Sequence, residues 1–359
     1  MSRIMQKLVD KIDSQSVIKF SDIDYFGDQK SWISTGSPVL DYNLRTMGYP
    51  SGIVEVRGAS QSGKTTFSLE ALKAVMNTYK DRAIPVILSS ERRDNRELAE
   101  MIGLDVDNVL IAKTRTIEKV FSEIARIVDE VNDMWSESEI EERPRFLFVW
   151  DSLGQTVSRQ EAETMDTRKN AKAGTKDEDK NAAMGAAARA IAFGLRGTAG
   201  LIDDNDLTLF IINRAYDNIG SVGKSSYGGK AMEFWPTIRL ELARVEGYKS
   251  GEDEIGQRTQ VYTVKTDFDR PKQKFSVEIG YGYGIVLGKD DIEFGIKHGI
   301  LKKHGAYGAK FNEKLSWQNR KDLYKLYEDK NPMLKVLLAK LTKKAHELVR
   351  AERAARLEK

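Results

Sequence analysis

A glycine-rich segment near residue 60 has the residue types and spacing that bind phosphate. The pattern G-x-x-x-x-G-K-[ST] follows the apolar run IVEV and precedes a helical pattern, with its fixed positions filled by Gly58, Gly63, Lys64 and Thr65. The glycines let backbone N–H groups turn toward anionic oxygens, and the start of a helix adds partial positive charge. Lys64 would reach the β- and γ-phosphates, and the Thr65 hydroxyl would bind Mg²⁺. Nucleotide binding is therefore predicted for Gly58, Ala59, Ser60, Gln61, Ser62, Gly63, Lys64, Thr65 and Thr66; the alternative is a glycine-rich turn without a ligand.

Two carboxylates follow apolar runs and could support hydrolysis of a bound nucleotide. Hydrolysis needs an acid that supports the metal ion and a base that positions water. Asp151 ends the run FLFVWD, and an acid at the carboxyl end of a buried parallel strand points into the crevice where ligands bind. Glu91 follows the run IPVILSS in the same way. The alternatives are an aspartate that caps the next loop and a glutamate solvated among charged neighbours.

These residues lie at the ends of short apolar runs that alternate with helical patterns. The alternation predicts a mostly parallel α/β sheet covered by helices on both faces, and the closely spaced later strands predict an antiparallel extension. Strands are predicted at 53–56, 84–88, 109–111, 146–150, 207–212, 238–242 and 260–265, and helices at 64–80, 94–102, 116–133 and 182–203. Residues 287–332 form a smaller unit with a hairpin at GAYGAKFNEKLS. Residues 333–359 form an amphipathic helix, which we expect to pack on that unit with its basic face in solvent rather than to bind duplex DNA or a partner.

Composition excludes several classes of protein. The 359 residues are 40% hydrophobic and 31% charged, as in folded globular chains, and include no cysteine. Disulfides, thiolate catalysis and cysteine-based metal sites are therefore excluded, and three histidines disfavour a histidine-rich metal site. We expect no membrane span and no signal peptide, because no apolar stretch is long enough. The net charge of +3 is concentrated in residues 333–359, so nucleic-acid binding would use local loops or this tail.

Two stretches, 155–181 and 214–230, do not fit packed structure. Long structureless loops inside a compact domain are usually functional or disordered. In the second stretch, glycines allow close backbone approach, lysines supply charge to phosphate, and tyrosines could stack on bases. These residues are Gly220, Gly223, Gly228, Gly229, Lys224, Lys230, Tyr216 and Tyr227. The alternative is a flexible surface loop, and the first stretch is the weaker candidate because its charges cancel.

The order of several motifs adds a family resemblance. The motifs ISTGS at 33–37, the phosphate loop, LSSERR, VWDS, AMGAAAR at 183–189, Asn213, Gly228-Gly229 and YGYGI at 281–285 follow one another along the chain. Together they resemble the RecA recombinases, both the bacterial proteins and their phage UvsX-type relatives, over most of the chain. The resemblance implies a RecA-like P-loop ATPase core over 33–286. It also implies a short N-terminal oligomerisation segment over 1–32 and a small α+β C-terminal domain over 287–359.

The resemblance implies roles for individual residues. Glu91 is expected to be the catalytic glutamate, Thr65 and Asp151 to support Mg²⁺, and Tyr281 to contact the nucleotide. Lys265 resembles the lysine that reaches the ATP of a neighbouring subunit. Two DNA-binding loops are expected near 155–184 and 214–230, with contacts from Met184, Gly185, Arg189, Arg196, Lys224, Gly228, Gly229 and Lys230.

The chain departs from the bacterial pattern at several positions. Arg214 replaces a glutamine that senses the γ-phosphate, and would bridge phosphate and loop as a charge. Leu98 replaces the tyrosine that covers adenine. Asp267 replaces a second inter-subunit lysine, for which Arg270 is near enough to substitute. The C-terminus is basic where the bacterial protein often ends in an acidic tail. These departures favour a divergent member of the family, such as one encoded by a phage.

The resemblance implies an ATP- and Mg²⁺-dependent DNA recombinase of the cytoplasm, or of the host cytoplasm if phage-encoded. It would form helical homo-oligomeric filaments on single-stranded DNA, hydrolyse ATP and catalyse pairing and strand exchange with homologous double-stranded DNA. Single-strand-binding and loader proteins are further expected partners. The alternative is a RecA-fold accessory protein that binds ATP and loads another recombinase; such proteins often lack the glutamate or the DNA loops, whereas Glu91, Arg189 and Gly228-Gly229 are present. A hexameric helicase would need a fused domain, for which thirty N-terminal residues are too short.

Overall fold

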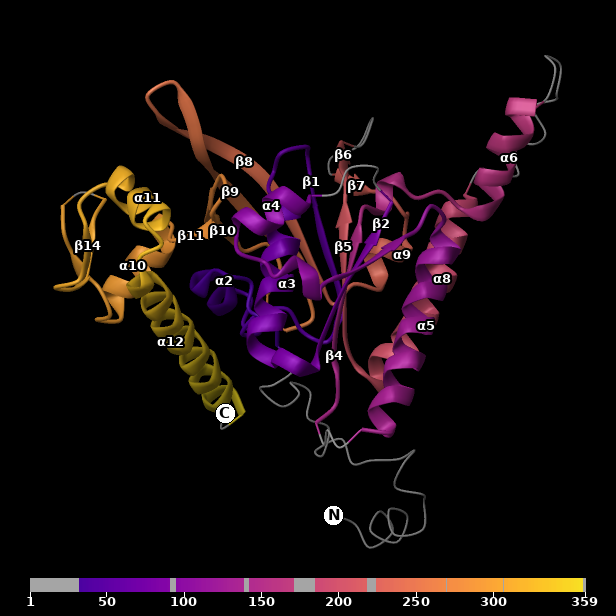
Figure 1. The fold of residues 1–359 in the computed structure, drawn as a ribbon, viewed down its shortest axis with the longest axis horizontal. Coiled ribbons are helices and arrows are strands. Elements are labelled where there is room, and N and C mark those ends of the chain that lie inside the picture. Colours follow the sequence, from indigo (N-terminus) through magenta and orange to yellow (C-terminus); the bar gives the residue numbers. More distant parts are fainter. Residues whose placement is uncertain are drawn as a thin grey trace, which may run out of the picture.

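The chain forms a central sheet with helices on both faces and a smaller unit of helices and strands beside one edge (Figure 1). This computed structural model describes residues 32–90, 95–138, 142–170, 185–217, 224–268, 270–305 and 307–357. All of the expected oligomerisation segment except Trp32 lies outside these ranges. Among the described helices, none is long and apolar enough to cross a membrane.

The central nine-stranded sheet has the order β11-β10-β9-β8-β1-β5-β4-β2-β3. Its strands are Gly52–Gly58 (β1), Ala83–Ser89 (β2), Leu110–Lys113 (β3), Arg145–Asp151 (β4), Asp206–Asn213 (β5), Ile238–Ser250 (β8), Asp253–Thr266 (β9), Lys274–Gly280 (β10) and Gly284–Val286 (β11). The strands from β8 to β3 are parallel, whereas β9, β10 and β11 are antiparallel. The predicted parallel sheet with an antiparallel extension is therefore confirmed. Because the sheet is parallel, the carboxyl ends of β1, β2, β4 and β5 meet at one edge.

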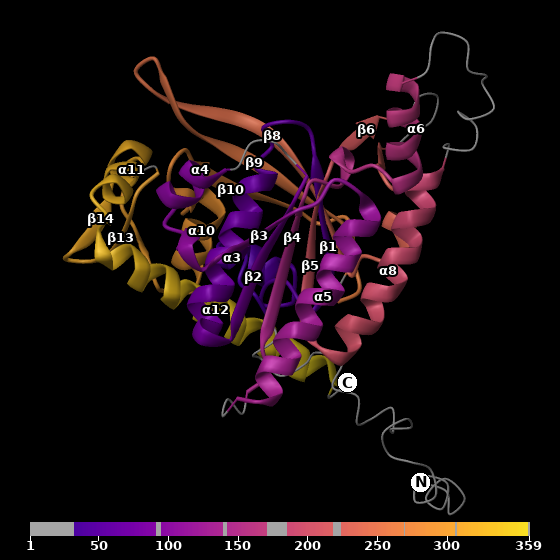
Figure 2. The ribbon, with the colours of Figure 1, turned by 45° about the vertical axis from the view of Figure 1, so that its right-hand side comes forward.

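Helices cover both faces of this sheet. The helices of this part of the chain are Pro38–Asn43 (α2), Lys64–Tyr79 (α3), Arg96–Met101 (α4), Ile117–Ser136 (α5), Arg159–Asn170 (α6), Ala186–Asp204 (α8) and Ala231–Phe234 (α9), with short 3-10 turns at Lys80–Arg82, Val106–Asn108 and Leu153–Gln155. One apolar layer joins the sheet to α3 through residues such as Phe67 and Leu72. The other joins it to α5 and α8 through Ile124 and Ile191. Figure 2 shows α3 on one side of the strands and α5 and α8 on the other.

The predicted strands and the four predicted helices are all present, and the structure adds further elements, among them β10 and β11. Strand β10 was missed although its alternation of polar and apolar residues is a strand signal, and β11, only three residues long, overlaps the YGYGI motif. Their presence completes the antiparallel half of the sheet beside the phosphate loop.

The expectation that 155–181 lacks structure is wrong over α6. Ser158 and Glu161 form a capping box: the Ser158 backbone N–H donates to Glu161 Oε2 (2.7 Å), and the Glu161 N–H donates to Ser158 Oγ (3.2 Å). The S-x-x-E signature was available in the sequence. In the second stretch, Ala215–Asp217 (β6) pairs with Lys224–Ser226 (β7), so the base of that loop is a short hairpin.

The smaller unit contains a three-stranded sheet and three helices. These are Lys302–Lys303 (β12), Ala309–Asn312 (β13), Leu315–Trp317 (β14), Lys289–Lys297 (α10), Arg320–Glu328 (α11) and Pro332–Leu357 (α12). Strands β13 and β14 form the predicted hairpin. Leu337 and Leu341 of α12 pack with Phe294 and Trp317 in the core of this unit. The domain boundary at residue 287 stays a prediction.

The terminal helix α12 continues beyond the small unit to the core. Val349 packs against Trp32 and Met47, and Glu352 accepts a hydrogen bond from Tyr42 Oη (2.6 Å). His346 Nε2 lies 3.2 Å from Asp41 Oδ2. Helix α12 therefore packs on the small unit, as expected, and also on the core near α2.

A buried carboxylate joins α2 to α10. Asp291 accepts hydrogen bonds at Oδ1 from Ser37 Oγ (3.1 Å) and the Val39 N–H (3.2 Å), and at Oδ2 from the Gly288 N–H (3.1 Å). Burial raises the pKa of Asp291 to about 6, although these donors oppose the shift. Because the folded pKa exceeds the unfolded value, Asp291 binds its proton more tightly in the folded protein.

We expect Asp291→Asn to alter the pH dependence of stability. As pH rises from about 4 to about 6, the wild type loses up to ~3 kcal/mol of unfolding free energy through Asp291, and the loss is complete above its folded pKa. The variant lacks this component. Urea unfolding of both proteins across this pH range measures it, since other carboxylates contribute equally to both. Identical pH profiles would show that Asp291 titrates normally.

Candidate functional site

The predicted phosphate loop connects β1 to α3, in a conformation that its neighbours require. Gly63 has φ +98° and Gln61 has φ +59°, both in the left-handed region. A Cβ atom on Gly58 would lie 2.4 Å from the Leu242 carbonyl oxygen, and one on Gly63 would lie 2.3 Å from Ile279 Cδ1. Glycine is therefore needed at these two positions for packing as well as for close approach of a ligand.

The loop carries polar atoms suited to an anion. Lys64 begins α3, and its Nζ lies 3.0 Å from the Gly58 carbonyl and 2.5 Å from the Ala59 carbonyl. The buried Ser62 hydroxyl has no hydrogen-bond partner among the described residues. With Thr65 and Thr66 these residues line a cavity of about 520 Å³. Its volume and donors fit a nucleoside triphosphate.

The donor set also fits a magnesium ion held partly by the nucleotide. Within the described ranges, no cluster of His, Asp and Glu could hold a metal alone. Mg²⁺ commonly takes few protein ligands together with phosphate oxygens. Thr65 at the start of α3 and Asp151 at the end of β4 are the residues of this chain that would support it.

Asp151 is fixed beside the end of β2. It is the last residue of β4 and pairs with Ser89 of β2. The Ser90 N–H donates to the Asp151 carbonyl (3.0 Å), and Ser90 Oγ donates to the Ser152 carbonyl (3.0 Å). Glu91 itself lies outside the described residues. The structure thus places its direct neighbour, Ser90, against Asp151.

Strand β9 supports the phosphate loop through side chains that sequence reasoning missed. Gln257 Nε2 donates to the Gln61 carbonyl (3.1 Å), and Thr259 Oγ1 donates to the Ser62 carbonyl (3.2 Å). Both side chains are buried. The only signal in the sequence was the presence of polar residues at alternate positions of a strand that is otherwise buried. This signal does not show that the side chains bind the phosphate loop.

Tyr281 completes this side of the cavity. Its hydroxyl lies 3.0 Å from Gln257 Oε1 and 3.1 Å from Glu254 Oε1. Desolvation and the hydrogen bond to Glu254 raise the pKa of Tyr281, so its hydroxyl stays a donor at neutral pH. Glu254 also pairs with Arg244, and Leu98 lines the same cavity. The expected contact of Tyr281 with the nucleotide is thus geometrically accessible.

Beneath the loop, a buried glutamate joins three strands. Glu55 of β1 is fully buried; its Oε2 accepts from Arg239 Nε of β8 (2.5 Å) and its Oε1 from Asn213 Nδ2 of β5 (2.8 Å). Asn213 Nδ2 also donates to the Tyr227 carbonyl (2.9 Å). The strand that carries the phosphate loop is therefore joined by hydrogen bonds to the end of the second predicted DNA loop. Sequence reasoning noted Asn213 as a motif residue but missed Glu55.

Arg214 lies at the same sheet edge. It follows β5, its side chain packs near Gly154, and its N–H donates to Asn213 Oδ1 (2.8 Å). The side chain is exposed, just beyond the end of β4 that carries Asp151. This position is compatible with a bridge between phosphate and loop.

Several of the predicted DNA-contacting residues lie where α8 begins. Gly185 precedes α8, and Arg189 and Arg196 lie exposed along it. A Cβ on Gly229 would lie 3.7 Å from Ala188, so the end of the second loop contacts α8 one residue from Arg189. Lys230 is exposed beside Gly229, and Lys224 starts β7. Met184 lies outside the described residues.

Lys265 is not at the phosphate loop of its own chain. Its Nζ donates to the Phe234 carbonyl (2.6 Å), and it pairs along the sheet with Arg239. Six residues of extended strand separate it from Thr259, a span of about 20 Å. Arg270 is exposed five residues further along the chain. Neither cation is therefore assembled into the cavity around Lys64 within one subunit.

Comparison with known proteins agrees with this geometry. The family model for the RecA N-terminal domain matches residues 1–134 and 167–286. Protein RecA of Clavibacter michiganensis is 32% identical over 279 residues, which cover 77% of this chain and 69% of the relative. Protein RecA of Staphylococcus aureus is 28% identical over 316 residues, covering 87% of this chain and 82% of the relative. The phosphate loop, the sheet topology and these matches together show that the chain belongs to the RecA family.

Proposed function

We propose that this protein is an ATP-dependent DNA recombinase that forms filaments on single-stranded DNA and catalyses homologous pairing and strand exchange. The observation that carries the proposal is the hydrogen-bonded path from Glu55 through Asn213 to the Tyr227 carbonyl. It joins the strand of the phosphate loop to the loop proposed to hold DNA. A bound nucleotide and bound DNA can therefore both favour the same arrangement of β1 and β5.

The proposed ATPase chemistry uses residues at one edge of the sheet. The loop N–H groups and Lys64 bind and orient the triphosphate, while Thr65 and Asp151 hold the magnesium ion, which neutralises phosphate charge. Glu91 accepts a proton from the attacking water. Arg214 links the terminal phosphate to the adjacent loop. Tyr281 contacts the nucleotide beside Leu98.

Two further roles require more than one molecule. Lys265 and Arg270 act on the ATP of a neighbouring subunit, because they lie far from the phosphate loop of their own chain. Arg189, Arg196 and Lys230 bind DNA phosphates, supported by backbone at Gly185, Gly228 and Gly229 and by Met184 and Lys224. Hydrolysis would then depend on both DNA and polymerisation.

The direct test combines electron microscopy with a strand-exchange assay on the full chain. With single-stranded DNA and a non-hydrolysable ATP analogue, we expect extended helical filaments; with ATP, we expect homologous pairing and exchange. Lys64→Ala is the matched control: we expect at least about tenfold weaker ATP binding, because the loop loses its counter-charge, and no exchange. Filaments without exchange by the wild type would favour the accessory-protein alternative, and normal ATPase in the variant would contradict the phosphate-loop assignment.

Mixing two variants tests catalysis across the subunit boundary. Glu91→Gln is expected to bind ATP and form filaments but to hydrolyse ATP about 100-fold more slowly, because an amide cannot accept the proton of water. Lys265→Ala is expected to bind nucleotide normally and lose DNA-stimulated ATPase, since cations supplied in trans are worth ~10³ in rate. In mixed filaments, an interface that pairs intact Glu91 with a neighbour's intact Lys265 should regain activity. If the ATPase rate of the mixed filaments never exceeds the sum of the rates of the two variants measured separately, the assignment of Lys265 to the neighbouring subunit's ATP is wrong.

Salt dependence tests the DNA path. We expect Arg189→Ala and Lys230→Ala each to weaken binding of single-stranded DNA and to lower the slope of log K against log salt by ~0.7, the value for one phosphate contact. Lys343→Ala, an exposed lysine on α12, is the matched control and should leave the slope unchanged. Unchanged slopes in both test variants would place the DNA elsewhere on the protein.

A further inference from the structure

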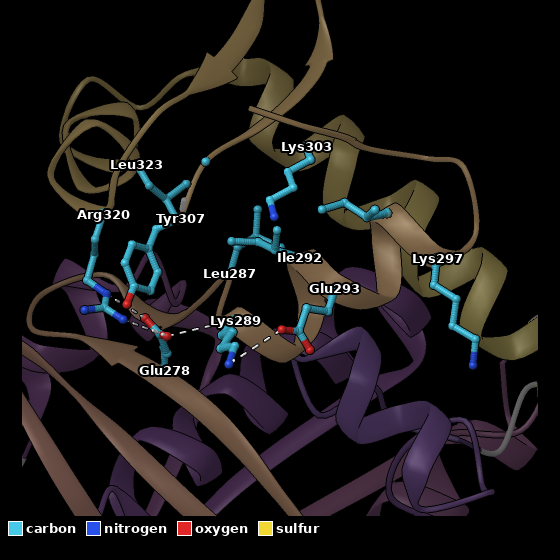
Figure 3. A pocket seen from close by; sticks show the side chains of 12 residues that line it. Glu278, Leu287, Lys289, Ile292, Glu293, Lys297, Lys303, Tyr307, Arg320 and Leu323 are labelled. Carbon is cyan, nitrogen blue, oxygen red and sulfur yellow. Dashed lines mark hydrogen bonds and ion pairs between the residues drawn. The ribbon is translucent and has the colours of Figure 1, made fainter. Parts of the chain in front are cut away.

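A second cavity lies between the edge of the central sheet and the small unit. It has a volume of about 580 Å³ and is lined by β10, α10, α11 and the turn between β12 and β13. Leu287, Ile292, Ile296 and Leu323 make its lining largely aliphatic (Figure 3). The volume lies in the range of ligand pockets, and the aliphatic part suits an apolar side chain.

The acids in this cavity are already neutralised by the protein. Glu278, nearly fully buried, pairs with Arg320 (Nε to Oε2, 3.3 Å) and accepts from the Lys289 N–H (3.3 Å). Glu293 pairs with Lys289 Nζ (3.6 Å). Arg320 is held further by the ring of Tyr248, whose centroid is 3.5 Å from the guanidinium carbon. These charges are therefore satisfied before any ligand arrives.

A cation and an aromatic ring remain available to a ligand. Lys303 is exposed and has no ion pair with any residue that the structure describes. Figure 3 shows its ammonium directed toward Ile292, while Lys297 stands at the rim and points away. Tyr307, 65% exposed, forms the opposite wall and points toward Glu278 and Arg320. The accessible charge is thus positive, above an apolar surface.

We propose that this cavity docks an acidic peptide segment of a partner protein, with an apolar side chain inserted between Tyr307 and Ile292 and a carboxylate paired with Lys303. Charge complementarity selects acidic flanks, and the aliphatic lining selects the inserted side chain. Nucleic acid fits less well, because its phosphate backbone offers no aliphatic group to fill the cavity. The site is independent of the proposed ATPase chemistry.

Fluorescence anisotropy on the full chain tests this site. The probe is a fluorescein-labelled peptide of about ten residues, in which aspartates flank a central Leu-Phe pair. We expect saturable binding with a Kd on the order of 10 μM. The same peptide with a Ser-Ser centre should bind at least about tenfold more weakly, because it lacks the inserted side chain. Lys303→Glu should raise the Kd about tenfold, and Tyr307→Ala should raise it at least about threefold. Lys343→Glu, the matched control on α12, should not change it.

Four outcomes would overturn the proposal. The first is no saturable binding below about 1 mM. The second is equal binding of the Leu-Phe and Ser-Ser peptides, which would indicate charge attraction alone. The third is equal weakening by Lys303→Glu and Lys343→Glu, which would remove any specific role for the cavity. The fourth is loss of binding to a labelled DNA oligonucleotide in Lys303→Glu and Tyr307→Ala with unchanged peptide affinity, which would make this a nucleic-acid surface. Thermal melts of each variant check that the fold is intact.

Discussion

The buried carboxylate of Glu55 is the constraint around which the central strands are arranged. A charge removed from water must be paired, and leaving such a group without its partner typically costs about 3–5 kcal/mol. Glu55 meets this requirement with Arg239 from β8 and Asn213 from β5. The two strands that flank β1 therefore cannot change register without exposing or unpairing a charge. This fixes the strand that delivers the phosphate loop relative to both neighbours.

The antiparallel half of the sheet contributes directly to the nucleotide site. Gln257 and Thr259 on β9 hold carbonyl groups of the phosphate loop, including that of Gln61 in its left-handed conformation. Holding these carbonyls fixes the peptide groups of the loop, and with them the N–H groups that would face a phosphate. Tyr281, at the end of β10, shares a hydrogen bond with Gln257. The cavity is thus built from both halves of the sheet, although the phosphate motif itself lies in the parallel half.

Local patterns predicted the parts of this protein that depend on local chemistry. The apolar runs located the core strands, and the spacing of Gly58, Gly63 and Lys64 located the phosphate loop. Partners distant in sequence could not be read in this way: Glu55 looks like a polar interruption in IVEV, and Gln257 lies almost two hundred residues from the carbonyl that it binds. Such pairs depend on strand order, which no local pattern specifies. The capping box of α6 differs, because Ser158 and Glu161 are a local signal that the charge balance of the segment concealed.

The contact between α12 and α2 joins the last helix of the chain to its first described helix. Trp32 and Met47 are covered by Val349, and Tyr42 is bound by Glu352. Domains generally fold as they leave the ribosome, N-terminal part first. The core can therefore assemble while this apolar patch is still uncovered by α12, and Val349 covers it only after α12 has been synthesised. A chain shortened before Val349 would present Trp32 and Met47 to chaperones and to other copies of itself.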